Sequence, residues 1–373
     1  MRICLTTTVM RSHGGISRYV MELSKRLVKE HEIHILTGKK EVGISGVKVH
    51  MAPTIFSPVS LRVASNTLSN TLISSHLKKK CVVDLIHGQG AEVIGPDVIT
   101  AHSCHKAAAE QQMKERGGRY QMLKPFEPRN NIVLAIEKYN YRKRKYRKAI
   151  SVSEGVKREL MTIYKVPDED VVVIPNGVDL EEFTPENRGK YQKPVREELG
   201  VEGEDIILLI TAWEFNRKGV RYIIESLPEL PKQVKLVVVG EDDKKPYLTH
   251  AEKAGVKKRV FFTGASKDVK RYYAASDIFV FPTSYEAFSL STLEAVASGL
   301  PLVTTKVNGT EELVKDGRNG FFVERDGKDI ADKIKKVIDY GIGKMGSNAR
   351  KTAMDYSWDK VAEKTSNVYK ELE

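Results

Sequence analysis

The chain has 373 residues, which is more than one hydrophobic core usually organises and which suits two domains. Hydrophobic residues make up 41% and charged residues 29%, as in globular proteins, and no apolar run reaches the roughly 18 residues of a membrane span. The net charge is +12. The first residues lack the pattern of a signal peptide, and the three cysteines lack the paired spacing of a disulfide framework or zinc site. We therefore expect a cytoplasmic protein whose cysteines are buried.

Short apolar runs alternate with amphipathic segments through the first half of the chain. Helices are predicted over 15–30, 57–80 and 154–164. Strands are predicted at RICLTT (2–7), IHIL (33–36), VKVH (47–50), VVDLIH (82–87), DVITAH (97–102), KAISVS (148–153) and VVVIPNG (171–177). This alternation is typical of βαβ units with a parallel sheet.

The same alternation returns in the second half. Amphipathic segments at 220–230 and 267–275 predict helices. Strands are predicted at DIILLIT (205–211), VKLVVVG (234–240), RVFFTG (259–264), DIFVFPT (277–283) and LPLVTT (300–305). The sequence therefore predicts an α/β protein with two Rossmann-like domains.

The two series meet in residues 176–200, where proline, glycine and charged residues interrupt the apolar periodicity. We therefore expect a first domain over 1–180 and a second over 181–355. Residues 356–373 have the apolar spacing of a helix and follow the second domain. We expect this C-terminal helix to pack back onto the first domain.

The positive charge is concentrated in the N-terminal half. Residues 1–150 hold 26 Lys and Arg against 11 Asp and Glu, whereas the rest of the chain holds 35 against 38. Two clusters stand out, at 78–80 and at YNYRKRKYRK over 139–148. Such a face favours an anionic membrane surface, an anionic acceptor or nucleic acid, although either cluster could be a solvated helix face. Nucleic acid is not expected because the chain has no recognised reading module.

The stretch SYEAFSLSTLEAVASGLP, residues 284–301, places two carboxylates in different settings. Glu286 lies in the loop after a predicted strand, and Glu294 lies on a helix for which Ser289 is a plausible N-cap. Ligands of open parallel sheets bind at the carboxyl ends of the strands, where a helix N-terminus suits a phosphate. Glu286 could then bind a sugar and Glu294 a ribose. The alternative is that both are solvated.

Four stretches follow one another along the chain: VIPNGVDLEEFTP, NRKGVRYIIESL, FVFPTSYEAFSLSTLEAVASGLPLVTT and VNGTEELVKDGRNGFFV. Together they resemble the large retaining glycosyltransferase family of GT-B fold (group 1, family 4) that uses nucleotide-diphospho-sugars. NRKGV and YEAFSLSTLEA are most similar to lipopolysaccharide-core glucosyltransferases. The resemblance covers nearly the whole chain and implies two Rossmann-like domains facing a cleft.

The resemblance also implies roles for the residues around the two glutamates. Glu286 would hold donor-sugar hydroxyls, and Glu294 would hold the ribose. The backbone N–H groups of Phe288, Ser289 and Leu290 would face the diphosphate. The donor-binding elements would thus belong to the second domain.

A lysine of the family that binds the pyrophosphate corresponds to Lys218 in NRKG. Its charge would neutralise the departing nucleotide, although a lysine in such a loop is otherwise usually solvated. The family arginine that precedes this lysine is missing, because the matching position reads Ala212–Trp213. Arg217 could replace it through bidentate phosphate contacts.

Two family features correspond to residues of the first domain. Gly14 and Gly15 in RSHGGISRYV match a glycine pair that lets the backbone approach the diphosphate. His102 in VITAHSC matches a histidine near the reacting sugar, where it would stabilise positive charge. The alternatives are a plain turn for the glycines and a strand-end histidine with its hydrogen bonds satisfied.

The resemblance implies a mechanism without a conventional nucleophile, in which the leaving phosphate takes the acceptor's proton. No Asp-x-Asp motif lies where a metal-dependent transferase would need it, and EDD at 241–243 would cap or solvate the next segment. We expect neither a metal nor another cofactor. Electrostatic stabilisation would then carry catalysis.

The sequence thus predicts a retaining hexosyltransferase. Its donor would be a nucleotide-diphospho-sugar, with a UDP-sugar favoured, and its acceptor a lipid-linked or saccharide molecule in cell-envelope glycan or glycolipid synthesis. The basic first domain would bind the inner face of the cell membrane. The alternatives are a sugar-nucleotide epimerase or phosphorylase of the same fold, and a non-catalytic membrane-surface binding protein. Donor base, donor sugar, acceptor and oligomeric state stay open.

Overall fold

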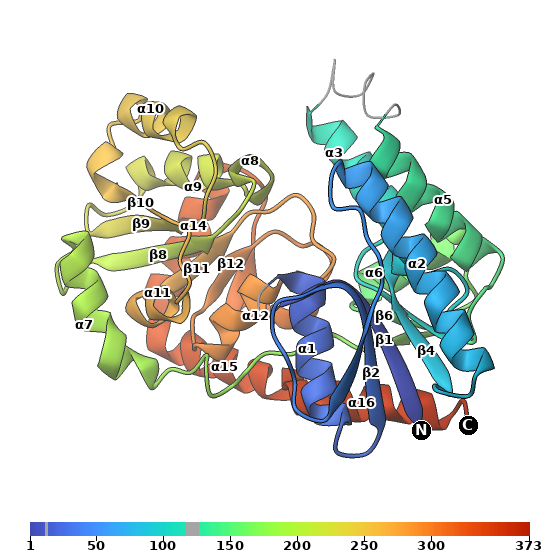
Figure 1. Cartoon of the computed structure of the whole chain (residues 1–373). Helices are drawn as coiled ribbons and strands as arrows, with labels where there is room; N and C mark the ends of the chain where they lie inside the picture. The colour runs from blue at the N-terminus through green and yellow to red at the C-terminus, as the bar shows by residue number, and fades with distance from the viewer. Residues whose placement is uncertain (12–13, 117–126) are drawn as a thin grey trace. The chain divides into compact units, whose positions relative to one another are not determined.

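The computed structural model describes residues 1–11, 14–116 and 127–373, and the chain divides into two compact units (Figure 1). Unit 1 comprises residues 1–177 and 358–373, and unit 2 comprises residues 178–357. Each unit is an α/β structure around one parallel sheet, as the alternating sequence pattern predicts. The first change of unit falls within the predicted stretch 176–200.

Unit 1 has a seven-stranded sheet in the order β3-β2-β1-β4-β5-β6-β7, and every neighbouring pair is parallel. Its strands are β1 Arg2–Met10, β2 Glu32–Lys40, β3 Val47–Met51, β4 Leu85–Gln89, β5 Val98–Ala101, β6 Lys148–Ser151 and β7 Val171–Val173. Its helices are α1 Gly15–Leu27, α2 Val59–Lys79, α3 His105–Arg116, α5 Pro128–Arg142, α6 Glu154–Glu159 and α16 Trp358–Lys370, with short 3₁₀ helices η1 Gly90–Glu92 and η4 Asp168–Asp170 and a π-helix η3 Leu160–Tyr164.

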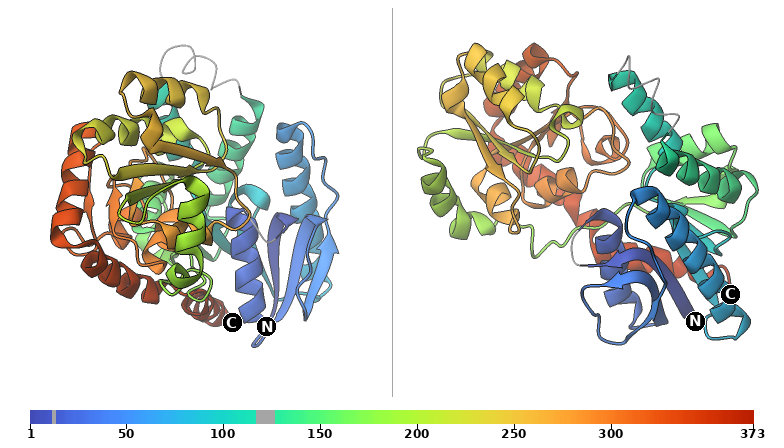
Figure 2. Two further views of the ribbon diagram at one scale, coloured as in Figure 1. Left: turned by 90° about the vertical axis from the view of Figure 1, so that its left-hand side faces the viewer. Right: turned by 45° about the horizontal axis from the view of Figure 1, so that its top comes forward.

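The two faces of β1 contact different helices because successive side chains of a strand point to opposite faces. Ile3 and Leu5 belong to the larger core, together with residues of α1 and α16, whereas Cys4 belongs to a smaller core that includes Leu77 of α2. Helices α1 and α16 pack side by side (Figure 2). Trp358, at the start of α16, is buried in the larger core.

Polar contacts also attach α16 to the sheet. Tyr369 is completely buried, and its hydroxyl lies 2.6 Å from Nδ1 of His87 in β4. Nε2 of His87 lies 2.6 Å from Oγ1 of Thr100 in β5. Because a buried polar group without a partner is costly, this chain of contacts fixes the register of α16 on the sheet.

The cysteine prediction was right for two of the three residues. Cys4 and Cys104 are buried. Cys81 is exposed, because it lies in the turn after α2 with a φ of 51°, where the chain leaves the helix. Within the described ranges, no helix is long and apolar enough to cross a membrane.

Unit 2 has a six-stranded parallel sheet in the order β10-β9-β8-β11-β12-β13. Its strands are β8 Ile206–Thr211, β9 Val234–Val239, β10 Val260–Gly264, β11 Ile278–Phe281, β12 Leu302–Thr304 and β13 Gly320–Phe322. Its helices are α7 Asn187–Leu199, α8 Phe215–Lys218, α9 Val220–Ser226, α10 Lys245–Lys253, α11 Lys270–Ala275, α12 Leu290–Ala297, α13 Thr310–Leu313, α14 Gly327–Tyr340 and α15 Ile342–Ala353, with turns η5 Leu227–Glu229, η6 Lys257–Arg259 and η7 Met354–Tyr356.

Most of the predicted linker 176–200 is helix α7, which packs against α11. Its composition concealed it, because Pro194 and many charged residues interrupt the apolar pattern. Arg196 is buried, and its guanidinium lies 2.6 Å from Oδ2 of Asp277, which directly precedes β11. A buried ion pair therefore anchors a segment whose charges suggest solvent.

Candidate active site

The centre of the unit 2 sheet is a topological switch point. From β8 the strand order runs outward through β9 to β10, and β11, on the other side of β8, begins a second series through β12 to β13. The loops after β8 and β11 therefore leave the same edge of the sheet and touch: the Ser284 backbone N–H donates to the Arg217 carbonyl at 3.0 Å. Ligands of open α/β sheets bind at such points.

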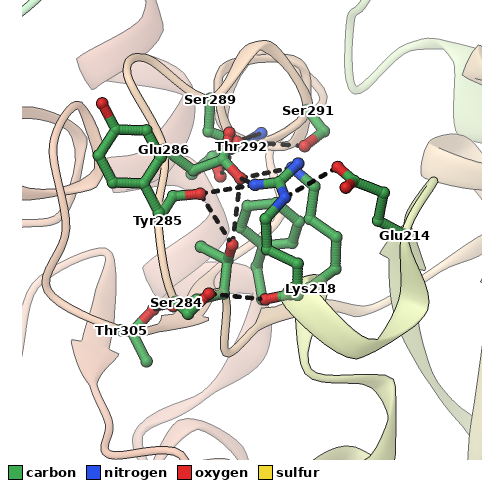
Figure 3. Close-up of polar contacts among 12 residues, drawn as sticks. Glu214, Lys218, Ser284, Tyr285, Glu286, Ser289, Ser291, Thr292 and Thr305 are labelled. Atoms are coloured by element: carbon green, nitrogen blue, oxygen red, sulfur yellow. Dashed lines mark hydrogen bonds and ion pairs between the residues drawn. The ribbon is translucent and has the colours of Figure 1, made fainter. Parts of the chain in front are cut away.

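Two cations and one carboxylate from these loops form a cluster (Figure 3). Oε1 of Glu286 forms an ion pair with Nζ of Lys218 and accepts a hydrogen bond from Nη1 of Arg217 at 3.0 Å. The Thr283 hydroxyl donates to the same oxygen at 3.1 Å. The exposed fractions of the Glu286, Lys218 and Arg217 side chains are 11%, 12% and 20%. This cluster is therefore largely removed from solvent.

The charges of the cluster shift one another's protonation. Burial alone raises the pKa of Glu286, but Lys218 and Arg217 outweigh it, so the pKa lies below its ordinary value. Burial lowers the pKa of Lys218 against the attraction of Glu286. Burial also lowers the pKa of Arg217, but the carboxylates of Glu286 and Glu214 outweigh it and raise that pKa. At neutral pH Glu286 and Arg217 are ionised.

The turn that carries Lys218 is fixed by the backbone around α8. Glu214, just before α8, has a φ of 61°, and the Phe215 N–H donates to Oδ2 of Asp242 at 2.7 Å. After α8, Gly219 has a φ of 81°, and a Cβ there would lie 2.2 Å from the carbonyl oxygen of Pro282. Only glycine allows this approach of the two loops.

Helix α12 begins beside the cluster and presents free backbone donors. Ser289 is its N-cap, as predicted, because its Oγ accepts from the Thr292 N–H at 3.1 Å. The N–H groups of Phe288, Ser289 and Leu290 donate to no other described residue. Gly309, with a φ of 79°, packs closely against the backbone at the start of α12. A Cβ there would lie 2.7 Å from Phe288 Cα and 3.3 Å from Ser289 N. The helix start can accept an anion.

Glu294 lies on α12 and is 9% exposed, so it is not the solvated flank that was the alternative. Its Oε2 accepts a hydrogen bond from the hydroxyl of Tyr273 at 3.1 Å. The same hydroxyl lies 3.1 Å from the Ser291 carbonyl oxygen and 3.2 Å from Oγ1 of Thr211. Tyr273 therefore holds one oxygen of Glu294 in place.

The other predicted site residues lie in unit 1, along a pocket of about 450 Å³. His102 lines it, with Nε2 2.8 Å from Oε1 of Gln89, and burial lowers the pKa of His102 to about 4. Gly14 and Gly15 line the same pocket at the start of α1, where Gly14 has a φ of 88°. Residues 12 and 13 of that motif lie outside the described residues.

The predicted site residues thus form two groups, one in each unit. Unit 2 brings together Lys218, Arg217, Glu286, Phe288, Ser289, Leu290 and Glu294, and unit 1 holds Gly14, Gly15 and His102. At the position where the family has an arginine, this chain has Ala212, which is buried, and Trp213, which is 62% exposed. Arg217 contacts Glu286 instead of extending into solvent.

The sequence interpretation missed Thr283, Tyr273 and Gly309. Only Gly309 had a local signal, as the glycine of VNGTEE. In the EDD stretch, Oδ2 of Asp242 accepts from the Phe215 N–H of α8, and Oδ1 of Asp243 accepts from the Lys245 N–H at the start of α10 at 3.1 Å. The carboxylates of Asp242 and Asp243 thus accept hydrogen bonds from nearby backbone N–H groups.

Comparisons with known proteins find glycosyltransferase matches along the chain. The family model described as glycosyl transferases group 1 matches residues 204–340, and the one described as Glycosyltransferase Family 4 matches residues 13–182. An uncharacterized glycosyltransferase of Methanocaldococcus jannaschii is 33% identical over 230 residues, 59% of each chain. The lipopolysaccharide glucosyltransferase WaaG of Escherichia coli is 26% identical over 322 residues, 83% of this chain and 82% of WaaG.

Solved structures share the fold over nearly the whole chain. A crystal structure of WaaG, a glycosyltransferase involved in lipopolysaccharide biosynthesis, has a TM-score of 0.78 at 23% identity and covers 98% of this chain and 99% of that one. Anabaena HepE in complex with UDP-glucose has a TM-score of 0.72 at 17% identity and covers all of both chains. The two family models together span most of the sequence, and the chain therefore belongs to the group 1, family 4 glycosyltransferases of GT-B fold.

Proposed function

We propose that this glycosyltransferase moves a hexose from a nucleotide-diphospho-sugar to a glycan or glycolipid acceptor, with retention at the anomeric carbon and without a metal. The observation that carries the proposal is the largely buried cluster of Lys218, Arg217 and Glu286 beside the start of α12, whose backbone N–H groups donate to no other described residue. It lies at the sheet edge where such folds bind ligands.

Each part of the cluster has a distinct task in this proposal. Lys218, Arg217 and the start of α12 bind the diphosphate and stabilise the charge that develops on it when the sugar leaves. Glu286, whose second oxygen is not used by these cations, accepts hydrogen bonds from sugar hydroxyls. Glu294, held by Tyr273, accepts hydrogen bonds from the ribose.

Metal independence rests on the same charges. The positive charges of Lys218 and Arg217 and the α12 donors supply the stabilisation that a divalent cation gives in other transferases.

His102 of unit 1 is neutral at pH 7 because burial lowers its pKa to about 4, so its ring is available as a hydrogen-bond partner for a substrate. We propose retention by analogy with the family to which the chain belongs.

The names of the relatives support the choice of substrates. HepE has been solved with UDP-glucose, which favours a UDP-sugar as donor here. WaaG is named for lipopolysaccharide, and a further relative in Escherichia coli transfers galactose to a diphosphoundecaprenol-linked GlcNAc. We therefore propose a saccharide or lipid-linked acceptor of the cell envelope.

The donor proposal is tested with a panel of UDP-, GDP- and ADP-sugars, read by thermal shift and by slow hydrolysis. A ligand that binds only the folded state raises the melting temperature by mass action. We expect one nucleotide class to stabilise the protein and Glu294→Ala to abolish the shift. A flat response from all three classes in a folded protein contradicts the proposal.

Two further readouts address the mechanism. We expect the rate of transfer to survive excess EDTA, and NMR of the product to show the anomeric configuration of the donor. An inverted product contradicts retention. Conversion of a UDP-sugar into its epimer without an acceptor would favour the epimerase alternative instead.

We also propose that unit 1 binds an anionic membrane surface through α2. Leu61, Leu68 and Leu72 are spaced along this helix, and their exposed fractions are 48%, 60% and 62%. The basic residues 78–80 follow at its end. An apolar stripe beside lysines suits the interface of an anionic bilayer.

The second basic cluster, 139–148, is a weaker candidate for that surface because it is partly engaged within unit 1. Arg144 pairs with Asp170 at 2.8 Å, and Nζ of Lys148 donates to the Glu169 carbonyl at 2.9 Å. We expect the double variant Leu68→Ser/Leu72→Ser to lose binding to phosphatidylglycerol vesicles, while Tyr340→Ser, an exposed aromatic of unit 2, retains it. Equal sedimentation of all three proteins contradicts the α2 surface.

A further inference from the structure

The pocket of unit 1 contains three arginines from three separate segments. Arg11 follows β1, Arg62 lies on α2 and Arg129 lies on α5, and all three line the same cavity of about 450 Å³. The cavity lies where β1, β4 and β5 end, since Thr8, Gln89 and His102 also line it. This convergence of guanidinium groups is not visible in the sequence, where the three residues are far apart.

No described carboxylate forms an ion pair with any of these three arginines. Among the described residues, none of the three guanidinium groups makes a hydrogen bond or an ion pair. Nε of Arg11 is buried without a partner. Arg217 in unit 2, in contrast, contacts two carboxylates. Unpaired guanidinium groups in a cavity attract an anionic ligand.

The two carboxyl groups in the cavity wall are occupied by other donors. Glu92 Oε1 accepts from Thr8 N at 2.9 Å and from Thr8 Oγ1 at 2.7 Å. Glu137 accepts from the His105 N–H at 3.0 Å and from the hydroxyl of Tyr164 at 2.8 Å. Burial raises the pKa of both Glu92 and Glu137 to about 7, so a large fraction of each is neutral at that pH. Positive charge therefore dominates the cavity.

The backbone adds further donors at the same wall. Helix α1 begins at Gly15 without a side-chain cap. A Cβ on Gly14 would lie 3.0 Å from Nη2 of Arg11, so the arginine and the helix start are immediate neighbours. A helix N-terminus beside an unpaired guanidinium favours an oxyanion with several acceptor oxygens.

We propose that this pocket binds a phosphate group carried by the acceptor, so that the substrate class of unit 1 is a phosphorylated or diphosphate-linked saccharide. The inference rests on the proposed transferase function, because it assigns the anion to the acceptor and not to the donor. Arg11, Arg62 and Arg129 hold the phosphate oxygens, while the start of α1 beside Arg11 keeps the role toward the donor diphosphate that the family resemblance gives it. Neutral saccharides of the same size would bind more weakly.

The test is calorimetric titration of the full chain, with unit 2 saturated by UDP, using glycerol 3-phosphate and inorganic pyrophosphate as probes and glycerol as the neutral comparison. We expect saturable binding of at least one phosphate probe, weakened about tenfold by Arg62→Gln or by Arg129→Gln. Tighter binding of glycerol 3-phosphate would indicate a monoester acceptor, and tighter binding of pyrophosphate a diphosphate-linked one. Arg142→Gln, on the same helix as Arg129 but outside the cavity, should leave both affinities unchanged.

Three results would overturn the inference: no saturable phosphate binding, equal binding in the Arg62→Gln/Arg129→Gln double variant, or an equal loss of UDP affinity in that variant. The last result would assign the anion to the donor. Melting temperatures identify any variant that fails to fold, and Arg62→Lys, which retains the charge, should recover part of the affinity. If phosphate binding is lost as expected while UDP never binds wild type, the donor proposal fails and the anion site stands.

Discussion

Glu286 shares one oxygen among a lysine, an arginine and a threonine hydroxyl, and this sharing predicts how its amide variant behaves. In Glu286→Gln the two cations lose their counter-charge but remain in place. UDP should then bind at least as tightly as in wild type, because its phosphates meet less competition. Sugar transfer should fall about 100-fold, since the charged acceptor for the sugar hydroxyls is gone.

The measurement is a pair of UDP titrations together with initial rates for wild type and Glu286→Gln. Glu197→Gln is the matched control, because Glu197 pairs at the surface with Lys193 and is 65% exposed. A variant that loses UDP affinity in parallel with activity would show that Glu286 acts on the nucleotide and not on the sugar.

Tyr273 positions Glu294, so its hydroxyl should matter for donor affinity. Tyr273→Phe removes the hydrogen bond to Oε2 of Glu294 and leaves the ring in its buried place. We expect the Kd for the nucleotide-sugar to rise about tenfold with little change in kcat. Tyr272→Phe, one residue earlier, serves as the control. An equal rise in Kd in both variants would show that the loss of affinity comes from general destabilisation and not from the contact between Tyr273 and Glu294.

The start of α12 depends on the absence of a side chain at Gly309. Gly309→Ala places a methyl group 2.7 Å from Phe288 Cα, so the donors of the helix must move. Gly317→Ala is a close control, because Gly317 has a φ of 73° and open space around its Cβ position. Both variants should lose about 1 kcal/mol of stability from the positive φ. Only Gly309→Ala should lose nucleotide-sugar binding, as measured by thermal shift.

The elements around the donor site could be predicted because they depend on local rules. Alternating apolar runs give the strands, and Ser289 satisfies free donors at a helix start in any fold. Helix α7 could not be predicted, because a buried pair between Arg196 and Asp277 stabilises it across 81 residues of sequence. The contacts of Tyr273 and Gly309 arise for the same reason from packing between distant segments.

The C-terminal helix α16 contacts β4 through His87, which is neutral in the folded protein. Burial lowers the pKa of His87 to about 3, whereas an unfolded histidine titrates near about 6.5. Protonation therefore favours the unfolded chain as pH falls from 6.5 towards 3. His102, with a pKa lowered to about 4, acts in the same direction.

Each such histidine should thus lower the free energy of unfolding on acidification below pH 6.5, by up to about 1.4 kcal/mol per pH unit, whereas Glu92 and Glu137, whose pKa burial raises to about 7, act in the opposite direction. Urea denaturation at a series of pH values measures this slope. His87→Gln should be less stable at pH 7 because it loses its contacts with Tyr369, yet its free energy of unfolding should rise relative to that of wild type as pH falls below 6.5. His76→Gln, at an exposed position of α2, should retain the wild-type slope. Parallel curves for all three proteins would exclude His87 as a source of the acid sensitivity.

The position of α16 in the core of unit 1 also governs the order in which the chain can fold during synthesis. Unit 2 is one continuous segment, so it has all its residues as soon as Ser357 has left the ribosome. Unit 1 is made first but lacks Trp358 and Tyr369 until the segment after unit 2 has emerged. The unit that is translated first is therefore the unit that is completed last. Its apolar face for α16 stays uncovered while the whole of unit 2 is synthesised.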